Sequence, residues 1–417
     1  MDYYNEIYQN LGNYQVLERL FRESPLEFRQ AFKRVYEDNP ESHVLEIWRV
    51  RLEYQGTTTI RTKPSSHSNI VRLIAIAAVV ALLVNLPVFF DMDELFYPIF
   101  GPTIILLGMS IYFMITEKPP KLMILAVLGV FGVAIIYLAT LHAHISDPLE
   151  QTLTLGMMNM PFFLWTISGM RFMAKYPSEP NKRVGFIKIT GEILIYTAII
   201  VICFGTLLVI GSLLSPGRGE FFDFFIEDYA MPIMLSAAPI AAIGLAKQDL
   251  GIRRIPGYIA RLLSPIILII MVIYGVSLAF AQTNPMHDRE LIIGLNGLLL
   301  GIMSVIFFVL SERRGRGQKN FGDMITFATV IIAILLDVFN ISAIMYRTWL
   351  TGLTATRFVV IGVNILFLIN LLGISFHMWR FIRDREDASG AIVFMVKYIP
   401  VYVIWTFLVA FVLPVFF

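Results

Sequence analysis

Long apolar blocks recur along this chain and constrain its fold more than any other feature of the sequence. From residue 69 onward, eleven such blocks follow one another, each near the roughly 20 residues that a helix needs to cross a bilayer core of about 30 Å. The composition agrees, because 57% of the residues are hydrophobic and only 15% are charged. The blocks predict an all-α, polytopic membrane protein with about 11 transmembrane helices.

Short polar connections separate the expected spans. The spans lie at residues 69–90, 95–116, 121–142, 151–173, 189–214, 226–246, 258–281, 290–311, 323–346, 357–379 and 397–417. Connections of this length exclude a nucleotide-binding domain, a kinase or a large external catalytic domain. The first apolar block follows a polar segment, so we expect it to be retained as a membrane anchor and not removed as a signal peptide.

Basic residues are distributed unevenly over these connections. With the N-terminus inside, the inner connections contain twenty-two Lys and Arg residues, whereas the outer ones contain only Arg218, Arg289, Arg347 and Arg357. Because Lys and Arg are retained on the cytoplasmic side, this pattern predicts a cytoplasmic N-terminus and an external C-terminus. The formal net charge of the whole chain is only +2, so membrane lipids are expected partners and nucleic acid is not.

The N-terminal part of the chain has a different composition. Residues 1–54 place apolar side chains at helical spacing among charged ones, and Ser24-Pro25-Leu26-Glu27 has the residues of a helix start. Residues 55–68 contain Thr, Ser, Gly and Pro, which is typical of a linker, and residues 69–417 form the transmembrane domain. Because about 55 residues build only a small core, we expect residues 1–54 to pack on cytoplasmic loops, bind a cytosolic protein or self-associate.

Asp337 is the most informative polar residue inside an expected span, because ionisable groups are costly in lipid. It lies about fourteen residues into the ninth span, which places it beyond the midplane toward the outer leaflet at 1.5 Å per residue. Asn340 follows one turn later on the same face. An unpaired carboxylate at that depth is protonated or matched to a cation. Either state suits a proton or cation path, and either also suits a structural pair.

Other polar residues inside the expected spans extend this hypothesis. Asn364 and Asn370 in the tenth span, and Asn296 in the eighth, are amides that can face the same interior. Such amides commonly join helices in lipid by hydrogen bonds, so structural pairing and an ion path both remain open. Glu192 is expected near the cytoplasmic start of the fifth span, where it reaches interfacial water.

The connection between the ninth and tenth spans carries the most distinctive motif. Gly352 permits a turn, Thr354 can cap the following helix, and Arg357 lies in its first turn. A cation at a helix N-terminus opposes the helix dipole. We therefore expect Asp337, the acidic outer loops, or an anionic headgroup or substrate to offset the charge of Arg357.

Together with Phe358, these residues form a Gly-x-Thr-x-x-Arg-aromatic motif at the start of a late span. In this motif the chain resembles domain of unknown function family 4153, a family of multi-spanning bacterial membrane proteins that usually has Tyr where Phe358 stands. The resemblance covers residues 69–417 and implies an integral protein of the bacterial inner (cytoplasmic) membrane. It supplies no activity.

Histidines and carboxylates in the outer connections give a weak metal signal. His142, His144 and His287 lie there beside acidic residues, and these groups bind Zn²⁺ or Mn²⁺. However, His142 and His144 are too close in sequence for the one-face pair of a helical zinc site, and acidic residues gather outside because basic ones are held inside. We assign no metal, cofactor or catalytic residue from the sequence.

Three classes of function remain open. The first is a secondary transporter or flippase of a small molecule or lipid-linked species, whose path is lined by Asp337, Asn340, Arg357 and Asn364. The second is a membrane sensor or scaffold acting through residues 1–54, and the third is a membrane enzyme acting on a lipid-linked substrate. Transport ranks first, because the sequence has no phosphate-binding loop, nucleophile elbow or other compact catalytic motif.

Overall fold

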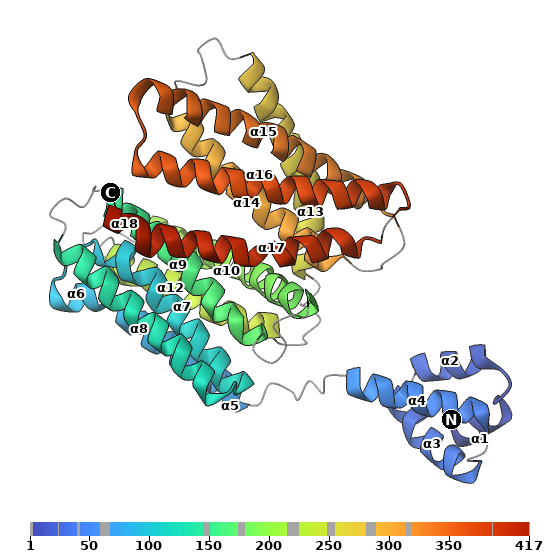
Figure 1. Cartoon of the computed structure of the whole chain (residues 1–417). Coiled ribbons are helices and arrows are strands. Elements are labelled where there is room, and N and C mark those ends of the chain that lie inside the picture. The colour runs from blue at the N-terminus through green and yellow to red at the C-terminus, as the bar shows by residue number, and fades with distance from the viewer. Residues whose placement is uncertain are drawn as a thin grey trace. The chain divides into compact units, whose positions relative to one another are not determined.

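A computed structural model describes most of the chain as helices joined by short connections (Figure 1). The described residues are 3–23, 25–39, 42–58, 67–144, 151–173, 180–214, 225–247, 255–280, 289–313, 319–385 and 387–416. Every regular element within these ranges is helical. The chain divides into two compact units, Met1–Ser66 and His67–Phe417.

The first unit is a small helical bundle. It consists of α1 (Tyr3–Gln9), α2 (Tyr14–Glu23), α3 (Pro25–Asp38) and α4 (His43–Thr58). Pro25 is the first residue of α3, which confirms the predicted helix start, since the fixed φ of proline suits the first helical position.

Aromatic rings form the centre of this unit. The Phe28 ring is fully buried, and its centroid lies 5.5 Å from that of Phe21 and 5.2 Å from that of Trp48. Each aromatic side chain buries about 150–250 Å² of surface. Three such rings in contact therefore supply a large buried apolar area for a unit of this length. The unit therefore has a core of its own.

Two helices extend a few residues into the predicted linker at residues 55–68. Helix α4 continues to Thr58, and α5 begins at His67, while residues 59–66 lie outside the described part. Gly56 lowers helix propensity by only about 1 kcal/mol, which does not stop a helix already started by the preceding apolar turns, and the first proline comes only at Pro64.

The second unit contains the apolar helices. They are α5 (His67–Val84), α6 (Leu86–Phe90), α7 (Phe96–Glu117), α8 (Lys121–His144), α9 (Gln151–Met173), α10 (Pro180–Leu214), η1 (Phe225–Ala230), α12 (Met231–Lys247), α13 (Ile255–Ala279), α14 (Arg289–Glu312), α15 (Phe321–Thr351), α16 (Ala355–Ile382), α17 (Ser389–Phe407), η3 (Leu408–Val412) and α18 (Leu413–Phe416). Within the described ranges, nine helical segments are long and apolar enough to cross a membrane. This is the architecture of an all-α polytopic membrane protein.

Two of the eleven predicted spans are not among these nine segments. The first is interrupted at Asn85 between α5 and α6, so that its apolar helix covers only Asn69–Val84. Pro87 stands at the start of α6 and cannot donate the backbone hydrogen bond that would continue α5. The fourth corresponds to α9, whose Gln, Thr, Asn and Ser residues dilute its apolar ones. The count of eleven and the orientation stay predictions.

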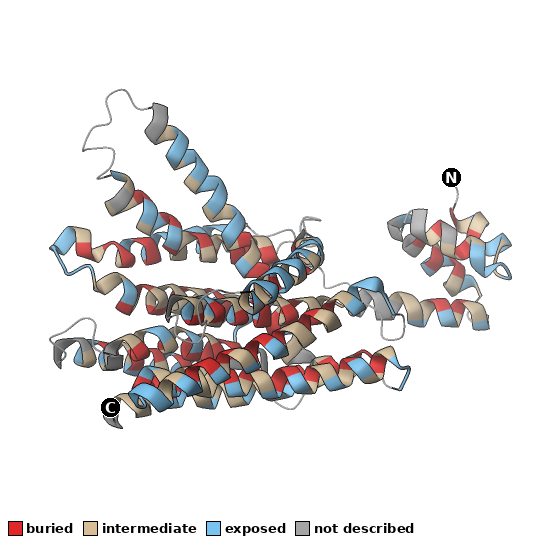
Figure 2. Cartoon of the chain, turned by 90° about the horizontal axis from the view of Figure 1, so that it is seen from above, coloured by how far each residue is buried: buried red, intermediate tan, exposed pale blue. Residues whose placement is uncertain are grey.

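Several hydrophobic clusters of buried side chains organise the second unit. The largest lies among α13, α14, α15, α16 and α17. A second joins α7, α8 and α9 to η3, and α5, α7, α10 and α12 pack around the others. Buried positions follow the faces that the helices turn toward one another, while the outward faces carry exposed residues (Figure 2), many of them large and apolar.

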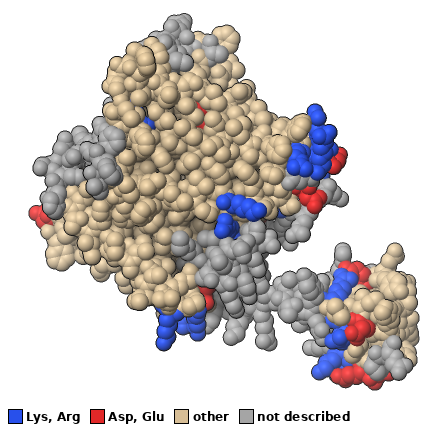
Figure 3. Space-filling view, viewed as in Figure 1, with Lys and Arg blue, Asp and Glu red and all other residues tan. Residues whose placement is uncertain are grey.

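Charged side chains gather at the ends of these helices. On the face that Figure 3 shows, the surface over the helix middles is almost uncharged, and basic and acidic groups cluster where α16 ends and α17 begins. Ion pairs lie at such ends: Lys188–Glu312 at 2.9 Å, Lys247–Glu117 at 3.0 Å, Arg313–Asp323 at 2.6 Å and Lys319–Asp384 at 2.6 Å. All four fall on the side that the sequence predicts to be cytoplasmic.

The first unit should show an acid-dependent stability that depends on Glu46. Arg49 and Tyr36 both donate hydrogen bonds to its carboxylate, at 2.6 and 2.8 Å, and lower its pKa from 4.5 to about 2. A depressed folded-state pKa stabilises the fold above the unfolded value of 4.5, and this contribution is lost as the pH falls toward 2. We expect Glu46→Gln to reduce the fall in melting temperature of residues 1–66 between neutral and acidic pH, measured by circular dichroism.

Glu37→Gln, at an exposed position of α3, is the matched control. It should leave the acid-induced fall as large as in the natural sequence. An equal reduction in both variants would contradict the role given to Glu46.

Candidate functional site

Buried polar side chains from four helices meet inside the largest core of the second unit. We call this set the polar cluster; its members are Asn296 on α14, Asp337 and Asn340 on α15, Asn364 and Asn370 on α16, and Tyr402 on α17. Burial of the four residues on α15 and α16 is nearly complete. The cluster is the candidate functional site, because polar groups at such a depth are rare in membrane helices.

Local capping sets the register of the two helices that supply most of the cluster. Asn320 and Asp323 form a capping box at the start of α15. Gly352, at φ 87°, ends this helix in a conformation that an L residue rarely adopts. The Thr354 hydroxyl then accepts a hydrogen bond from the backbone N–H of Arg357 and caps α16, as the sequence predicts.

Two exposed tryptophans mark the ends of this helix pair. Trp349, in the last turn of α15, has 88% of its surface exposed, and Trp379 lies in the last turn of α16. Trp379 lies 24 residues after Ala355, the first residue of α16. The length of α16 between these two residues is about 36 Å at 1.5 Å per residue. Tryptophan is enriched at both membrane interfaces, and this spacing fits a bilayer core with its interfaces.

Asp337 lies near the middle of α15, with 16 residues before it and 14 after it in the helix. The helix continues to Thr351 instead of ending near residue 346, and the expected position of Asp337 beyond the bilayer midplane stays a prediction. The first turns and the last turns of α15 are both capped, so the helix is longer than its apolar pattern indicates. Asp337 thus lies next to the midpoint of the helix, which is Leu336.

An amide triad forms one layer of the polar cluster. The Asn296 Oδ1 atom accepts hydrogen bonds from Asn340 Nδ2 and Asn364 Nδ2, both at 2.8 Å. Its own Nδ2 donates to the Ile292 carbonyl at 2.7 Å. Asn296 therefore ties α14, α15 and α16 together, and the sequence placed it only among several amides that can face the interior.

The carboxyl of Asp337 belongs to a second layer, one turn away along α15. Asn370 Nδ2 donates to Tyr402 Oη at 2.9 Å, and Asp337 interacts electrostatically with the same tyrosine. Neither carboxyl oxygen of Asp337 has a hydrogen-bond partner in the described part of the chain, and the same holds for Oδ1 of Asn340, Asn364 and Asn370.

The polar cluster consequently has more acceptors than donors. Five oxygen atoms face no donor, and each unsatisfied buried acceptor costs about 1–3 kcal/mol. A proton or a cation would satisfy these acceptors. Carboxylate and amide oxygens accept protons or hydrogen bonds, and they are the oxygen ligands that hard metal cations prefer. This is the chemistry that the arrangement can perform.

Aromatic side chains and close helix packing enclose the cluster. The Tyr402 ring lies 6.4 Å from Phe307 and 5.9 Å from Phe367, measured between centroids. Gly362 on α16 lies so close to Trp405 on α17 that an added Cβ atom would overlap the indole. This close approach holds α17 on α16 and keeps Tyr402 over the carboxyl layer.

Helix α17 contains a proline, Pro400, beside the cluster. Pro400 has no N–H to donate to the carbonyl of Val396, four residues earlier, and that carbonyl instead accepts a hydrogen bond from Arg183 Nη1 of α10 at 3.2 Å. Further along, the helix continues as the π-helix η3, Leu408–Val412. Prolines and π-helices are the usual places where helices bend, so α17 is the helix of the site most suited to movement.

Arg357 is not part of the polar cluster. Its guanidinium donates to the carbonyl of Gly352 at the C-terminal end of α15, where the negative end of that helix dipole offsets the charge. Along α16 it lies about 10 Å from Asn364, at 1.5 Å per residue. The offset expected from Asp337 is therefore supplied by backbone of the preceding helix.

Other residues singled out in the sequence lie elsewhere. Glu192 lies 12 residues into α10 and is only 2% exposed, so its expected place near the helix start is wrong, because α10 begins at Pro180. His142 and His144 lie on α8, where their side chains are not described, and His287 lies outside the described residues. In the described ranges no three His, Cys, Asp or Glu side chains gather as a metal site.

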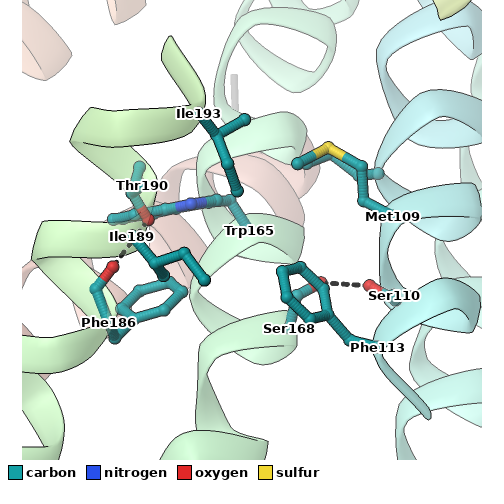
Figure 4. Close-up of a pocket in the computed structure, with 10 residues that line it drawn as sticks. Met109, Ser110, Phe113, Trp165, Ser168, Phe186, Ile189, Thr190 and Ile193 are labelled. Carbon is teal, nitrogen blue, oxygen red and sulfur yellow. Dashed lines mark hydrogen bonds between the residues drawn. The ribbon is translucent and has the colours of Figure 1, made fainter. Parts of the chain in front are cut away.

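A small cavity lies among α7, α9 and α10 (Figure 4). Ser110, Ser168 and Thr190 contribute its hydroxyl groups, and the Ser110 and Ser168 oxygens are 2.6 Å apart. Its volume is ≈ 20 Å³, which holds about one water molecule. Such a space fits a structural water between helices and no larger ligand.

Asn296→Leu tests the amide triad. The substitution keeps the side-chain size but leaves the amide groups of Asn340 and Asn364 without their acceptor, so we expect a loss of roughly 1–3 kcal/mol in stability. Thermal unfolding of the purified chain in detergent measures it. Ser304→Ala, at an exposed position of the same helix, should have little effect, and equal melting of both variants would contradict the assigned contacts.

Comparisons of the chain with protein-family models, with curated proteins and with solved structures found no match. The family resemblance carried by Gly352, Thr354 and Arg357 therefore stays a prediction.

Proposed function

We propose that this chain is a secondary transporter in which a proton or monovalent cation bound at Asp337 drives the movement of a small molecule or lipid-linked species. The observation that carries the proposal is the buried carboxyl in the middle of α15, whose two oxygen atoms have no donor in the described residues. A permanent structural pair would supply a donor to such a group.

The charge of the cluster favours a single positive charge. Asp337 is its one carboxylate, and the remaining members are amides and a phenol. One negative charge is matched by one proton or one monovalent cation, whereas divalent cations are commonly held by several carboxylates. The unpaired oxygens of Asn340 and Asn370 are further ligands for the cation.

Access to the site requires a conformational change, because Asp337 is fully buried. Pro400, which leaves the Val396 carbonyl to Arg183 instead of to a backbone N–H within the helix, makes α17 the helix that moves. Its opening would uncover Tyr402 and then Asp337. Binding of the ion changes the charge of the core and hence the relative stability of the open and closed forms, which is the basis of coupling.

Asp337→Asn should abolish ion exchange while leaving the fold intact. The amide cannot bind a proton at physiological pH and lacks the charge that attracts a cation. Exchange of ²²Na⁺ and of protons across vesicles containing the purified chain measures the effect without knowledge of the substrate. We expect the variant to fall to the rate of protein-free vesicles for the ion that the natural chain exchanges.

Ser342→Ala, at an exposed position of α15, is the control and should keep the natural rate. Elution of both variants as single species from a sizing column shows that they are folded. An Asp337→Asn variant with unchanged exchange would overturn the proposal.

A sensor or scaffold role of the N-terminal unit is the second candidate. The unit has its own core, and Ile47 and Val50 on α4 expose more than half of their surface one turn apart. Exposed apolar pairs of this kind suit contact with a cytosolic protein or with a second copy. We therefore propose residues 1–54 as the docking element of the chain.

Deletion of residues 1–66 separates the two candidates. If the unit docks a partner, the truncated chain should keep its ion exchange in vesicles, because the polar cluster lies wholly in the second unit. In cells that lack the natural chain, the intact chain should restore growth, and the chain without residues 1–66 should not. A truncated chain that retains the full cellular effect would rule out the docking role.

A further inference from the structure

Aromatic side chains follow one side of α17 along most of the helix. Phe394, Tyr398, Tyr402 and Trp405 succeed one another at intervals of four, four and three residues, and such spacing places them on one side. The ring centroids of Phe394 and Tyr398 are 6.2 Å apart, and those of Tyr398 and Tyr402 are 5.3 Å apart. Rings therefore flank Tyr402, the member of the polar cluster on this helix, in both directions.

Two of these rings occupy the places of missing side chains on α16. Phe394 lies against Gly373, and Trp405 lies against Gly362, so closely that an added Cβ atom at either glycine would overlap the ring. The atoms in contact belong to the outer edges of the rings, Cε1 and Cζ of Phe394 and Cζ2 and Cη2 of Trp405. Each ring can therefore leave its glycine by side-chain rotation, without a shift of either backbone.

The two glycine contacts enclose the carboxyl layer. They are eleven residues apart on both helices, which is about 16 Å at 1.5 Å per residue. The hydrogen bond between Asn370 and Tyr402 lies within this interval on each helix, and Asp337 interacts electrostatically with the same tyrosine. Along α17 the carboxyl layer is therefore bounded by Phe394 on one side and by Trp405 on the other.

Packing alone holds the indole of Trp405 in its place. Its Nε1 atom is buried and has no acceptor within the described residues, and an unmet buried donor is unfavourable. Rotation of the indole away from Gly362 frees this N–H to find an acceptor. The closed position is thus one that the side chain can leave without breaking a hydrogen bond of its own.

Pro400 lies between the two contacts, six residues after Phe394 and five before Trp405. It lacks the N–H that would bind the Val396 carbonyl, and this carbonyl accepts from Arg183 Nη1 of α10 instead. Prolines are places where helices bend. A bend at Pro400 moves one half of α17 while the other half stays packed on α16, so the two contacts can open one at a time.

We infer that these two contacts are the gates of the proposed ion site, one toward each side of the membrane. This role rests on the transport function proposed above, since a gate is needed only where an ion passes. In the predicted orientation, Phe394 on Gly373 is the cytoplasmic gate, and Trp405 on Gly362 is the external gate. When one ring leaves its glycine, water and the ion reach the carboxyl layer from that side, while the other ring keeps the opposite side closed. The full burial of Asp337 agrees with both gates being closed here.

Labelling of a cysteine inside the site tests the gates. Asn370→Cys, in a chain with Cys203→Ser, places a thiol in the carboxyl layer, where a membrane-impermeant thiosulfonate reacts with its thiolate once water enters. The reagent is added to right-side-out and to inside-out membrane vesicles. We expect Gly373→Ala to raise the labelling rate at least about tenfold from one side and Gly362→Ala to do so from the other, since the rate follows the open fraction.

Gly294→Ala on α14 is the matched control, because an added Cβ atom there points into open space. It should leave labelling slow from both sides. Phe394→Ala and Trp405→Ala remove each ring without adding an atom to α16, and each should open the same side as the glycine variant of its gate. Labelling from the same side for both gates, from both sides in a single variant, or unchanged in all four variants would overturn the gates.

The labelling readout is independent of ion movement. It needs water at position 370 but neither Asp337 nor an ion gradient, so it can follow the gates even if Asp337→Asn exchanges ions like the natural chain. Conversely, unchanged labelling would overturn the gates and leave the ion site untouched. Elution as a single species from a sizing column shows that a variant is folded, and a glycine variant that fails this check is replaced by the ring variant of the same gate.

Discussion

The absence of water around a membrane helix is the constraint on which the rest of this structure depends. Every polar group placed in the middle of such a helix must find a partner inside the protein. The amide triad around Asn296 meets this requirement with two hydrogen bonds at 2.8 Å. Asp337 does not, because no donor in the described residues faces its carboxyl. The amide layer is thus held together by structural hydrogen bonds, whereas the carboxyl layer is the part of the core at which we propose that an ion binds.

Close packing of α17 makes this contrast possible. The missing side chain of Gly362 lets Trp405 approach α16, which brings Tyr402 over the carboxyl layer. At the same time, Pro400 weakens α17 where Arg183 takes up the released carbonyl. The helix that covers the site thus also lacks one of its own backbone hydrogen bonds, at Pro400. The proposed transport function requires both a covered site and a helix that can bend to open it.

Local signals in the sequence were reliable where the structure depends on neighbouring residues alone. Pro25 begins α3, and Thr354 caps α16. Signals that depend on the length of a helix were less reliable. The first span breaks before Pro87, and α10 begins at Pro180, which leaves Glu192 deep in the bundle. Apolar periodicity locates the middle of a helix well, but it says little about where polar end turns stop.

The candidate site divides in the same way. Asp337, Asn340 and Asn364 could be selected from the sequence because polar residues are conspicuous in apolar blocks. Their actual partners could not. Tyr402 resembles any other aromatic residue in a span, yet it receives the Asn370 amide, and Arg357 is held by the backbone of Gly352 instead of by a distant carboxylate.

The sequence by itself determined that this is an all-helical chain with repeated membrane-length apolar segments and a separate polar N-terminal part, since composition and periodicity act along the chain. Only the tertiary structure decided which polar residues meet, which are satisfied and which face of α16 receives α17. The physical reason is that hydrogen bonds and ion pairs between helices depend on distances of about 3 Å across the bundle, and the order of residues along one helix contains no measure of them.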